Sequence, residues 1–317
     1  MTAKSKESQI IKLAAKFKSA IGLIGLIIVM SFLSEYFLTV HNLMNITRQV
    51  SINAVLAIGM TFVILTGGID LSVGSVLALS SVITAGLMSS GMNIALVLII
   101  GIGVGTLLGL LNGLLVAKGR MQSFIVTLGM MTIARGLTLI YSDGRPISGF
   151  DKSFRFLGAG HVLGIPVPVI IMFALLAVSY VILKKTPFGR YVYAIGGNEK
   201  ATELSGINTD KIKIGVYAIS GFLASISGII LASRLNSAQP IAGTGYELDA
   251  IAAVVLGGTS LAGGQGGIVG TIIGALIIGI LNNGLNLLNV SSFYQLVAKG
   301  AVILIAIFLD TRSQKRD

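Results

Sequence analysis

The segment LTGGIDLSVGSVLAL, residues 65–79, decides how this chain must fold. Its flanks are apolar enough for a membrane helix, but Gly67, Gly68, Asp70 and Ser72 interrupt them. A broken helix leaves backbone amides that lipid cannot satisfy, so the break must be buried in protein or face a watery cavity. Asp70 and Ser72 then have two alternative roles, capping the next helix or acting directly in a pathway or gate, and the sequence leaves both open.

The composition of the whole chain is typical of a polytopic membrane protein. Its 317 residues have a mean hydropathy of +0.92 and only 11% of them are charged. Cysteine is absent and there are only two histidines, which excludes disulfides and argues against a metal site or a bound cofactor. The net charge of +11 lies in short runs between apolar segments, a pattern of membrane topology rather than of nucleic-acid binding.

Apolar runs predict about ten transmembrane helices within a single membrane domain, residues 20–310. An amphipathic segment (1–19) precedes this domain and a polar tail (311–317) follows it. With a cytoplasmic N-terminus, sixteen Lys and Arg residues fall in the cytoplasm and five outside, so we expect both termini in the cytoplasm of a bacterial inner or plasma membrane. The ten segments are 20–38, 50–66, 72–90, 94–117, 122–141, 163–183, 213–233, 249–262, 267–289 and 293–310.

The two halves of the chain share a repeated pattern. The break at 65–79 has a counterpart in LGGTSLAGGQGGIVG, residues 256–270, and GLLNG (109–113) matches GILNNG (279–284). Five spans per half would insert the halves with opposite orientation, a common plan of transport proteins. We therefore predict an all-α membrane protein of two inverted five-helix repeats with broken helices, the repeats covering about 50–141 and 213–310.

Glycine stripes and amides follow the breaks in both halves. The stripes, at Gly101 to Gly113 and Gly266 to Gly274, predict close helix packing. The amides either form hydrogen bonds between helices or line a path for a polar solute, and the isolated cations Arg135 and Lys299 are expected to pair with an acid or reach an interface. The candidate pathway or gate residues are Gly67, Gly68, Asp70, Ser72, Asn112, Gly257, Gly258, Asn282 and Asn283.

The longest cytoplasmic loop, residues 184–212, is the candidate site for a partner. The chain has no phosphate-binding G-x-x-x-x-G-K-[ST] motif, so an ATP-driven mechanism requires a separate ATPase. Within the loop, GGNEKATELSGI (196–207) predicts a short helix with Asn198 as N-cap and Gly206 as its C-terminal stop. This helix either docks a cytoplasmic partner or merely connects two spans.

Three stretches resemble one known family over most of the chain. LTGGIDLSVGS, GGNEKATELSGI and the long run from AQPIAGTGYELDAIAAVVLGG to GILNNGLNLL are similar to the membrane permeases of bacterial ABC importers for monosaccharides, and within them to the ribose branch. The resemblance implies a transport subunit rather than an enzyme. It also implies a homodimeric pathway in the lipid bilayer, a cytoplasmic ABC ATPase and an extracytoplasmic sugar-binding protein.

The resemblance assigns two sets of contact residues. The common EAA-x-x-x-G coupling pattern is present only loosely, so the resemblance implies the docking role of this helix better than its individual contacts. The ATPase-coupling residues are Asn198, Glu199, Ala201, Leu204, Gly206 and Ile207. The longest outer loops supply the candidate contacts for the binding protein, which are Arg145, Arg155, Arg234, Tyr246 and Glu247.

Other classes of transport protein remain as alternatives. An ion-coupled secondary carrier for a small polar solute is the main one, although few acidic residues fall within the spans. A passive channel would need no partner. An intramembrane enzyme lacks any Ser-His, His-Glu-x-x-His or paired-aspartate constellation in the spans.

Overall fold

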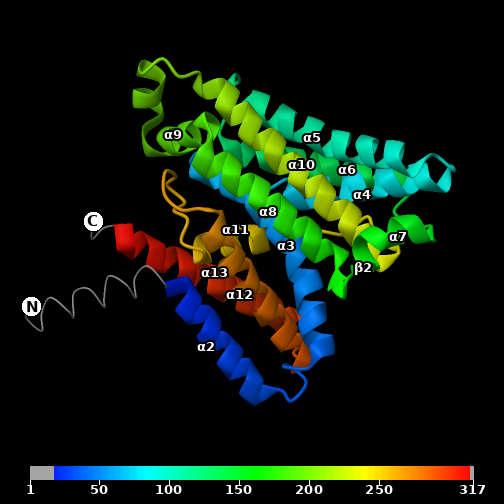
Figure 1. The fold of residues 1–317 in the computed structure, drawn as a ribbon. Helices are drawn as coiled ribbons and strands as arrows, with labels where there is room; N and C mark the ends of the chain where they lie inside the picture. The colour runs from blue at the N-terminus through cyan, green and yellow to red at the C-terminus, as the bar shows by residue number, and fades with distance from the viewer. Residues whose placement is uncertain (1–17, 315–317) are drawn as a thin grey trace, which may run out of the picture.

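The computed structural model describes residues 18–314, which form twelve helices and four two-residue strands (Figure 1). The predicted N-terminal segment, apart from its last two residues, and the last three residues of the predicted tail lie outside the described residues. The helices are α2 (Lys18–Leu33), α3 (Val40–Leu65), α4 (Val73–Ser89), α5 (Ile94–Ala117), α6 (Ser123–Ser142), α7 (Lys152–Ala159), α8 (Val167–Lys185), α9 (Pro187–Leu204), α10 (Thr209–Leu235), α11 (Tyr246–Leu256), α12 (Ile268–Leu287) and α13 (Ser292–Gln314).

Each of the ten predicted apolar segments falls on one helix, but several boundaries differ. α3 begins ten residues earlier than predicted, because the Thr39 hydroxyl caps it by accepting a hydrogen bond from the Asn42 amide. α8 begins at Val167, since a hairpin of β2 (His161–Val162) and β3 (Ile165–Pro166) precedes it. The segment predicted over 249–262 is helical only to Leu256.

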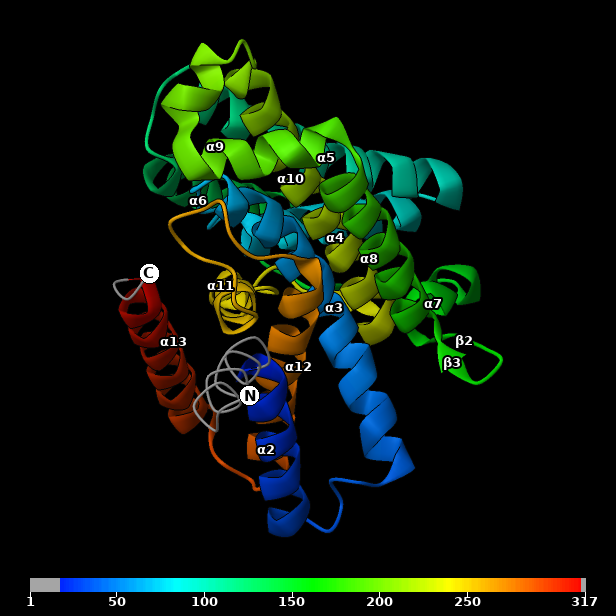
Figure 2. The same cartoon turned by 60° about the vertical axis from the view of Figure 1, so that its left-hand side comes forward.

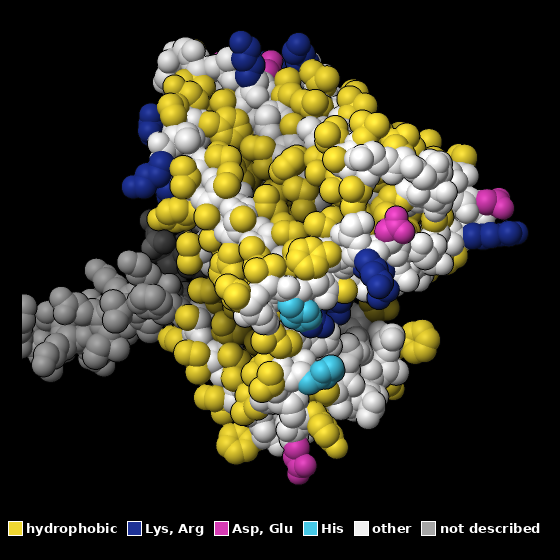
Figure 3. Space-filling view, turned by 45° about the vertical axis from the view of Figure 1, so that its right-hand side comes forward, with side chains coloured by type: hydrophobic (Ala, Val, Ile, Leu, Met, Phe, Trp, Pro, Cys, Tyr) yellow, Lys and Arg dark blue, Asp and Glu magenta, His cyan; other side chains and the backbone are white. Residues whose placement is uncertain are grey.

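Membrane-spanning potential is clear for six of these helices. By length and composition, α3, α5, α6, α8, α10 and α12 are each able to cross a membrane. α4 and residues 19–33 of α2 are apolar but shorter. The chain is therefore an all-helical polytopic membrane protein, and Figure 3 shows a broad hydrophobic surface with most charged side chains near its edges.

α3 and α10 form the centre of the bundle. α3 is buried without interruption from Val50 to Leu65. α10 packs along α5, α4 and α3, while α3 packs along α12 and α11. Outside these, α6 packs on α4 and α13 on α11. Figure 2 shows α11 nearly end-on, with α12 and α3 beside it and α13 at the edge of the molecule.

The glycine stripes pack as predicted, except that Gly266 lies in the second break before α12 rather than on a helix. A Cβ on Gly109 would collide with the Tyr217 carbonyl of α10, and a Cβ on Gly105 would come within 2.7 Å of the Gly221 carbonyl oxygen. In the second half, a Cβ on Gly274 would collide with the Ala253 carbonyl of α11. These positions hold glycine because the backbones of two helices touch there.

The two ends of the bundle differ in structure. α9 lies at one end, where α2 also begins and α13 ends (Figure 1). α7 lies at the other end, where β1 (Ile147–Ser148) pairs antiparallel with β4 (Ser237–Ala238). We refer to these as the α9 end and the α7 end.

Candidate coupling and translocation site

Three glycine pairs from distant parts of the chain meet toward the α9 end: Gly67–Gly68, Gly196–Gly197 and Gly263–Gly264. The Gly264 amide donates a hydrogen bond of 3.0 Å to the carbonyl of Leu65, the last residue of α3. A Cβ on Gly196 would collide with that carbonyl oxygen and with the Gly264 nitrogen. The two breaks recognised in the sequence therefore touch each other, and α9 touches both.

The second part of α9 is a separate short helix, which we call the coupling segment (residues 198–207). Asn198 has non-helical backbone angles, and its Oδ1 accepts a hydrogen bond of 3.0 Å from the Ala201 amide. The segment ends at Gly206, whose φ of 81° is readily adopted only by glycine. This confirms the predicted cap and stop. The preceding helix, 187–197, was not predicted and places Gly196 and Gly197 against the breaks.

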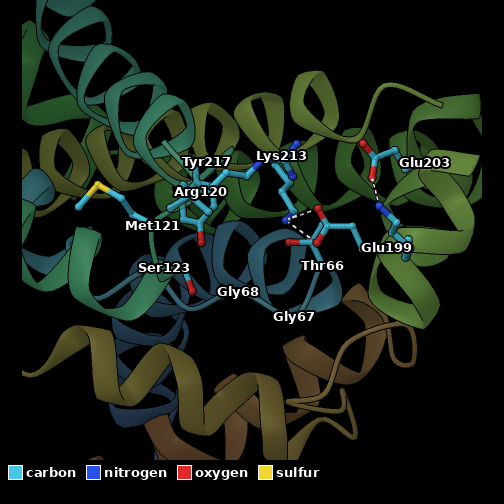
Figure 4. A pocket seen from close by; sticks show the side chains of 12 residues that line it. Thr66, Gly67, Gly68, Arg120, Met121, Ser123, Glu199, Glu203, Lys213 and Tyr217 are labelled. Carbon is cyan, nitrogen blue, oxygen red and sulfur yellow. Dashed lines mark hydrogen bonds and ion pairs between the residues drawn. The ribbon is translucent and has the colours of Figure 1, made fainter. Parts of the chain in front are cut away.

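A cavity of about 480 Å³ separates the coupling segment from the first break (Figure 4). Across it, the Lys213 ammonium of α10 binds the Glu199 carboxylate at 2.6 Å. The cavity is also lined by Thr66, Gly67 and Gly68 of the break and by Tyr217, which lies over Gly68. The Lys213–Glu199 pair thus connects the coupling segment to the central helix α10.

Asp70 lies in the first break and is buried in a hydrogen-bond network rather than exposed to a pathway. One carboxylate oxygen accepts from the Ser72 amide at 3.0 Å and from its hydroxyl at 2.6 Å. The other accepts from the Ser220 hydroxyl of α10 at 2.8 Å. Asn112 of α5 donates to the Ser72 hydroxyl oxygen at 2.9 Å. Ser72 occupies the N-cap position of α4 without a side-chain capping bond, so Asp70 organises the turn before the helix and fastens it to α10.

The amides of α12 differ in their surroundings. Asn283 exchanges two hydrogen bonds with Asn42 at the start of α3, at 2.8 and 3.0 Å, which is the packing role that the sequence left open. Asn282 is buried beside Asp249 of α11. Gly257 lies at the end of α11, against the Gly270 carbonyl, whereas Gly258 has a φ of 87° and open space around it.

Two cations bind α11 and the turn before it. The Lys299 ammonium of α13 binds the buried Asp249 carboxylate at 3.0 Å. Arg135 of α6 donates to the carbonyls of Pro240 at 2.6 Å and Ala242 at 2.9 Å. The sequence predicted that these cations would find partners, but it did not identify Asp249 or the turn before α11. Among the described residues, no group of three or more His, Cys, Asp or Glu side chains is placed to hold a metal ion.

The candidate docking residues separate into two sets. Arg145 and Arg155 are exposed at the α7 end. Tyr246 and Glu247 lie in the first turn of α11 and are only partly exposed, with the Glu247 carboxylate close to Gly74 of α4. The prediction that they belong to an outer loop is wrong, because residues 239–245 fold back among the helices.

Arg234 belongs to a basic cluster that sequence reasoning missed in part. Its guanidinium donates to the side-chain Oδ1 of Asn45 at 3.1 Å. Arg48, one turn further along α3, contacts His161 of the β2–β3 hairpin at 2.5 Å. Both arginines are half-buried. Arg48 and His161 are far from Arg234 in sequence, so no local pattern connects them.

Comparisons with known proteins identify the family of the chain. The family model for the permease component of branched-chain amino acid transport systems matches residues 42–307. Ribose import permeases of Haemophilus influenzae and Bacillus subtilis are each 58% identical, over 92% of this chain and 92% and 91% of theirs. The D-allose transport permease of Escherichia coli is 44% identical over 87% of this chain and 85% of its own. No solved structure matches the chain.

Proposed function

Because this chain belongs to the family of permease components that the branched-chain amino acid transport model describes, we propose that it is the membrane subunit of an ATP-driven ribose importer. The named substrates of its relatives support a sugar: identity is 58% to two ribose permeases, 44% to the allose permease and 40% to the L-arabinose permease of Escherichia coli. The relatives are named as permeases, which are transport components rather than enzymes.

Inverted repeats are supported by how the helices pack. The proposal equates α3 to α6 with α10 to α13 in order, with α2 and α8 as the fifth helix of each half. Under this exchange, packing of α10 on α5 and α4 becomes packing of α3 on α12 and α11. Likewise, the α4–α6 contact becomes the α11–α13 contact. With alternating direction along the chain, equivalent helices run in opposite directions, as inverted repeats require.

Ten spans and a cytoplasmic α9 end complete the proposed topology. The described chain begins at the α9 end with α2 and finishes there with α13 (Figure 1), and α9 brings the basic loop 184–212 to the same end. The positive-inside rule places that end in the cytoplasm of the bacterial inner membrane. The α7 end, with Arg145 and Arg155, then faces outward.

A second copy is proposed to cover the face formed by α6, α11 and α13. Residues 239–245 form turns there, and Ile241 and Leu248 expose 69% and 49% of their surface. Arg135, within α6, holds this turn at the depth of the membrane helices. Non-helical backbone at that depth cannot face lipid, so a partner protein or a watery path must cover it. A homodimer with its pathway on this face would supply both a partner protein and a watery path.

Coupling to a separate ATPase is proposed to pass through residues 198–207. Leu204 exposes 80% of its surface at the α9 end, although it is apolar, which suits a docking contact. The segment continues directly from Gly196 and Gly197, which touch both breaks. The mechanism rests on the contact of Gly196 with Leu65 and Gly264. Because these backbones touch, any displacement of α9 must displace the backbone at Leu65 and Gly264. Closure of the ATPase dimer would then change both breaks together.

The sugar-binding protein is proposed to dock at the α7 end. Arg145, Lys152 and Arg155 are exposed cations there, and Arg48 and Arg234 are half-buried. Such a surface favours a partner with acidic residues on its docking face. Because the binding protein supplies selectivity, the permease needs only weak contacts with the sugar, and a site that held its solute tightly would slow release.

Reconstitution tests the proposal. The tagged chain is purified with its partners and placed in liposomes with a ribose-binding protein, and uptake of labelled ribose is measured with and without ATP inside. We expect a co-purifying ATPase and uptake that requires ATP and survives an ionophore. A stable chain without ATPase, with uptake that an ionophore abolishes and ATP does not affect, would instead establish an ion-coupled carrier.

A pair of leucine variants tests the docking site. Leu204→Asp should abolish co-purification of the ATPase. Leu163→Asp is the matched control, since Leu163 is 98% exposed at the opposite end, in the β2–β3 hairpin. Equal ATPase recovery with both variants would show that residues 198–207 are only a connector.

A further inference from the structure

A second cavity, of about 520 Å³, opens at the α9 end between α8, α9 and the start of α12. It is separate from the cavity beneath the first break. Its wall is mainly apolar, and its only charged lining residue is Lys184 in the last turn of α8. The other residues that matter here are Tyr180 and Leu183 of α8, Tyr193 of α9, and Ile268 and Val269 of α12.

The polar groups of this cavity lie at one side. The Lys184 ammonium stands over the Tyr193 ring, 4.8 Å from its centroid. The Tyr193 hydroxyl donates a hydrogen bond of 3.0 Å to the Gly266 carbonyl in the second break. Tyr180 lies one turn further into α8 and is exposed. Tyrosines beside a lysine at the end of an apolar helix are typical of the level of lipid headgroups.

The stretch of chain that follows Lys184 is positively charged. Residues 184–198 contain Lys184, Lys185 and Arg190 and no Asp or Glu, and all three cations are exposed. None of the ion pairs among the described residues involves them. A basic cluster next to an apolar cavity between membrane helices matches an anionic headgroup with its acyl chain. A soluble metabolite would find few hydrogen-bonding groups on such a wall.

We propose that this cavity binds one anionic phospholipid of the leaflet at the α9 end. Lys184 binds the phosphate, and the acyl chain lies against Leu183, Ile268 and Val269. The lipid bridges α8 and α12, which have little direct contact with each other. Because Tyr193 binds Gly266, an occupied site braces the second break against α9. The proposed lipid site requires only that the chain spans a membrane, and it does not depend on which sugar is transported.

Native mass spectrometry of the purified full-length chain tests the site, with phosphatidylglycerol or phosphatidylcholine added to the detergent. We expect the wild type to retain one phosphatidylglycerol in preference to phosphatidylcholine. Lys184→Gln should weaken retention of phosphatidylglycerol about fivefold, the effect of removing one cation near a charged headgroup. Lys185→Gln is the matched control, since Lys185 lies in the same turn outside the cavity, and it should have a smaller effect.

A shape variant tests the acyl-chain contact. Val269→Trp puts a large side chain into the cavity at a residue that is already 57% exposed, and it should lower retention of phosphatidylglycerol while Lys184 is intact. Thermal unfolding and gel filtration confirm that each variant is folded. Equal losses with Lys184→Gln and Lys185→Gln would overturn the proposal, since they indicate diffuse attraction of charged lipid. Unchanged retention by a folded Val269→Trp variant would also overturn it.

Discussion

Gly196→Ala is the sharpest test of backbone contact as the route of coupling. The new methyl group would overlap the Leu65 carbonyl oxygen and the Gly264 nitrogen, both of which are backbone and cannot rotate away. Overpacking of this kind costs about 1–3 kcal/mol. The arrangement shown would therefore be disfavoured by about 1–3 kcal/mol relative to one in which α9 has moved away.

This cost is enough to change the balance between two conformations. At about 1.4 kcal/mol per factor of ten, it shifts the equilibrium by roughly 5- to 140-fold. We expect a variant whose ATPase no longer depends on the loaded binding protein and whose ribose uptake falls at least about fivefold. Both are measured in proteoliposomes that contain the complete importer.

Gly197→Ala is the matched control for this variant. Its Cβ would have no neighbour within 4 Å, yet it lies in the same turn and gains the same helix propensity as Gly196→Ala. It should keep coupled transport. If Gly196→Ala couples ATP hydrolysis to uptake as well as wild type does, the contact does not transmit movement. An equal loss of coupled transport in both variants would show that the cause is the changed helix propensity of α9 rather than the contact with Leu65 and Gly264.

Three further substitutions test other parts of the proposal. Asp70→Asn removes an acceptor from a buried network and should destabilise the chain by about 1–3 kcal/mol in a thermal unfolding assay, while transport by the folded fraction persists; normal stability with lost transport would make Asp70 a gate instead. Lys299→Met leaves Asp249 buried without its cation and should cost roughly 3–5 kcal/mol, most of which a second change, Asp249→Asn, should restore. Arg145→Glu should slow association of the binding protein about tenfold at low salt, with the difference vanishing at high salt and unfolding unaffected, since this side chain is 83% exposed.

The sequence predicts the features that local patterns control. Glycine at every fourth position is enough to predict that α5 packs tightly against another helix, because only the spacing matters. Asn198 and Gly206 fix the ends of the coupling segment through bonds within a few residues. The apolar runs locate all ten segments because hydrophobicity is also a local property of the sequence. Their ends are less certain, as at Thr39, because a single capping bond moves a boundary by several residues.

Long-range contacts could not be predicted. Nothing near Gly196 indicates that it meets Leu65, since 131 residues separate them (196 minus 65) and the contact is between backbones. Asp249 was overlooked as an intramembrane acid because its partner, Lys299, lies fifty residues away. The turn at 239–245 resembles an ordinary loop in sequence, and distant groups hold it among the helices: Arg135 binds two of its carbonyls and Gly74 touches the backbone of Gly243.

The arrangement of α11 and the breaks constrains where movement is able to occur. Lys299 and Arg135 fasten α11 and the turn before it to two different helices, so the first part of α11 resists displacement. The stretch 257–267 lacks helical hydrogen bonds along most of its length and contacts α9 through Gly264. A push from α9 therefore reaches the break before it reaches α11. Such a push acts through backbone atoms, so it requires close contact between backbones rather than particular side chains. This is consistent with a coupling segment that resembles the EAA pattern only loosely.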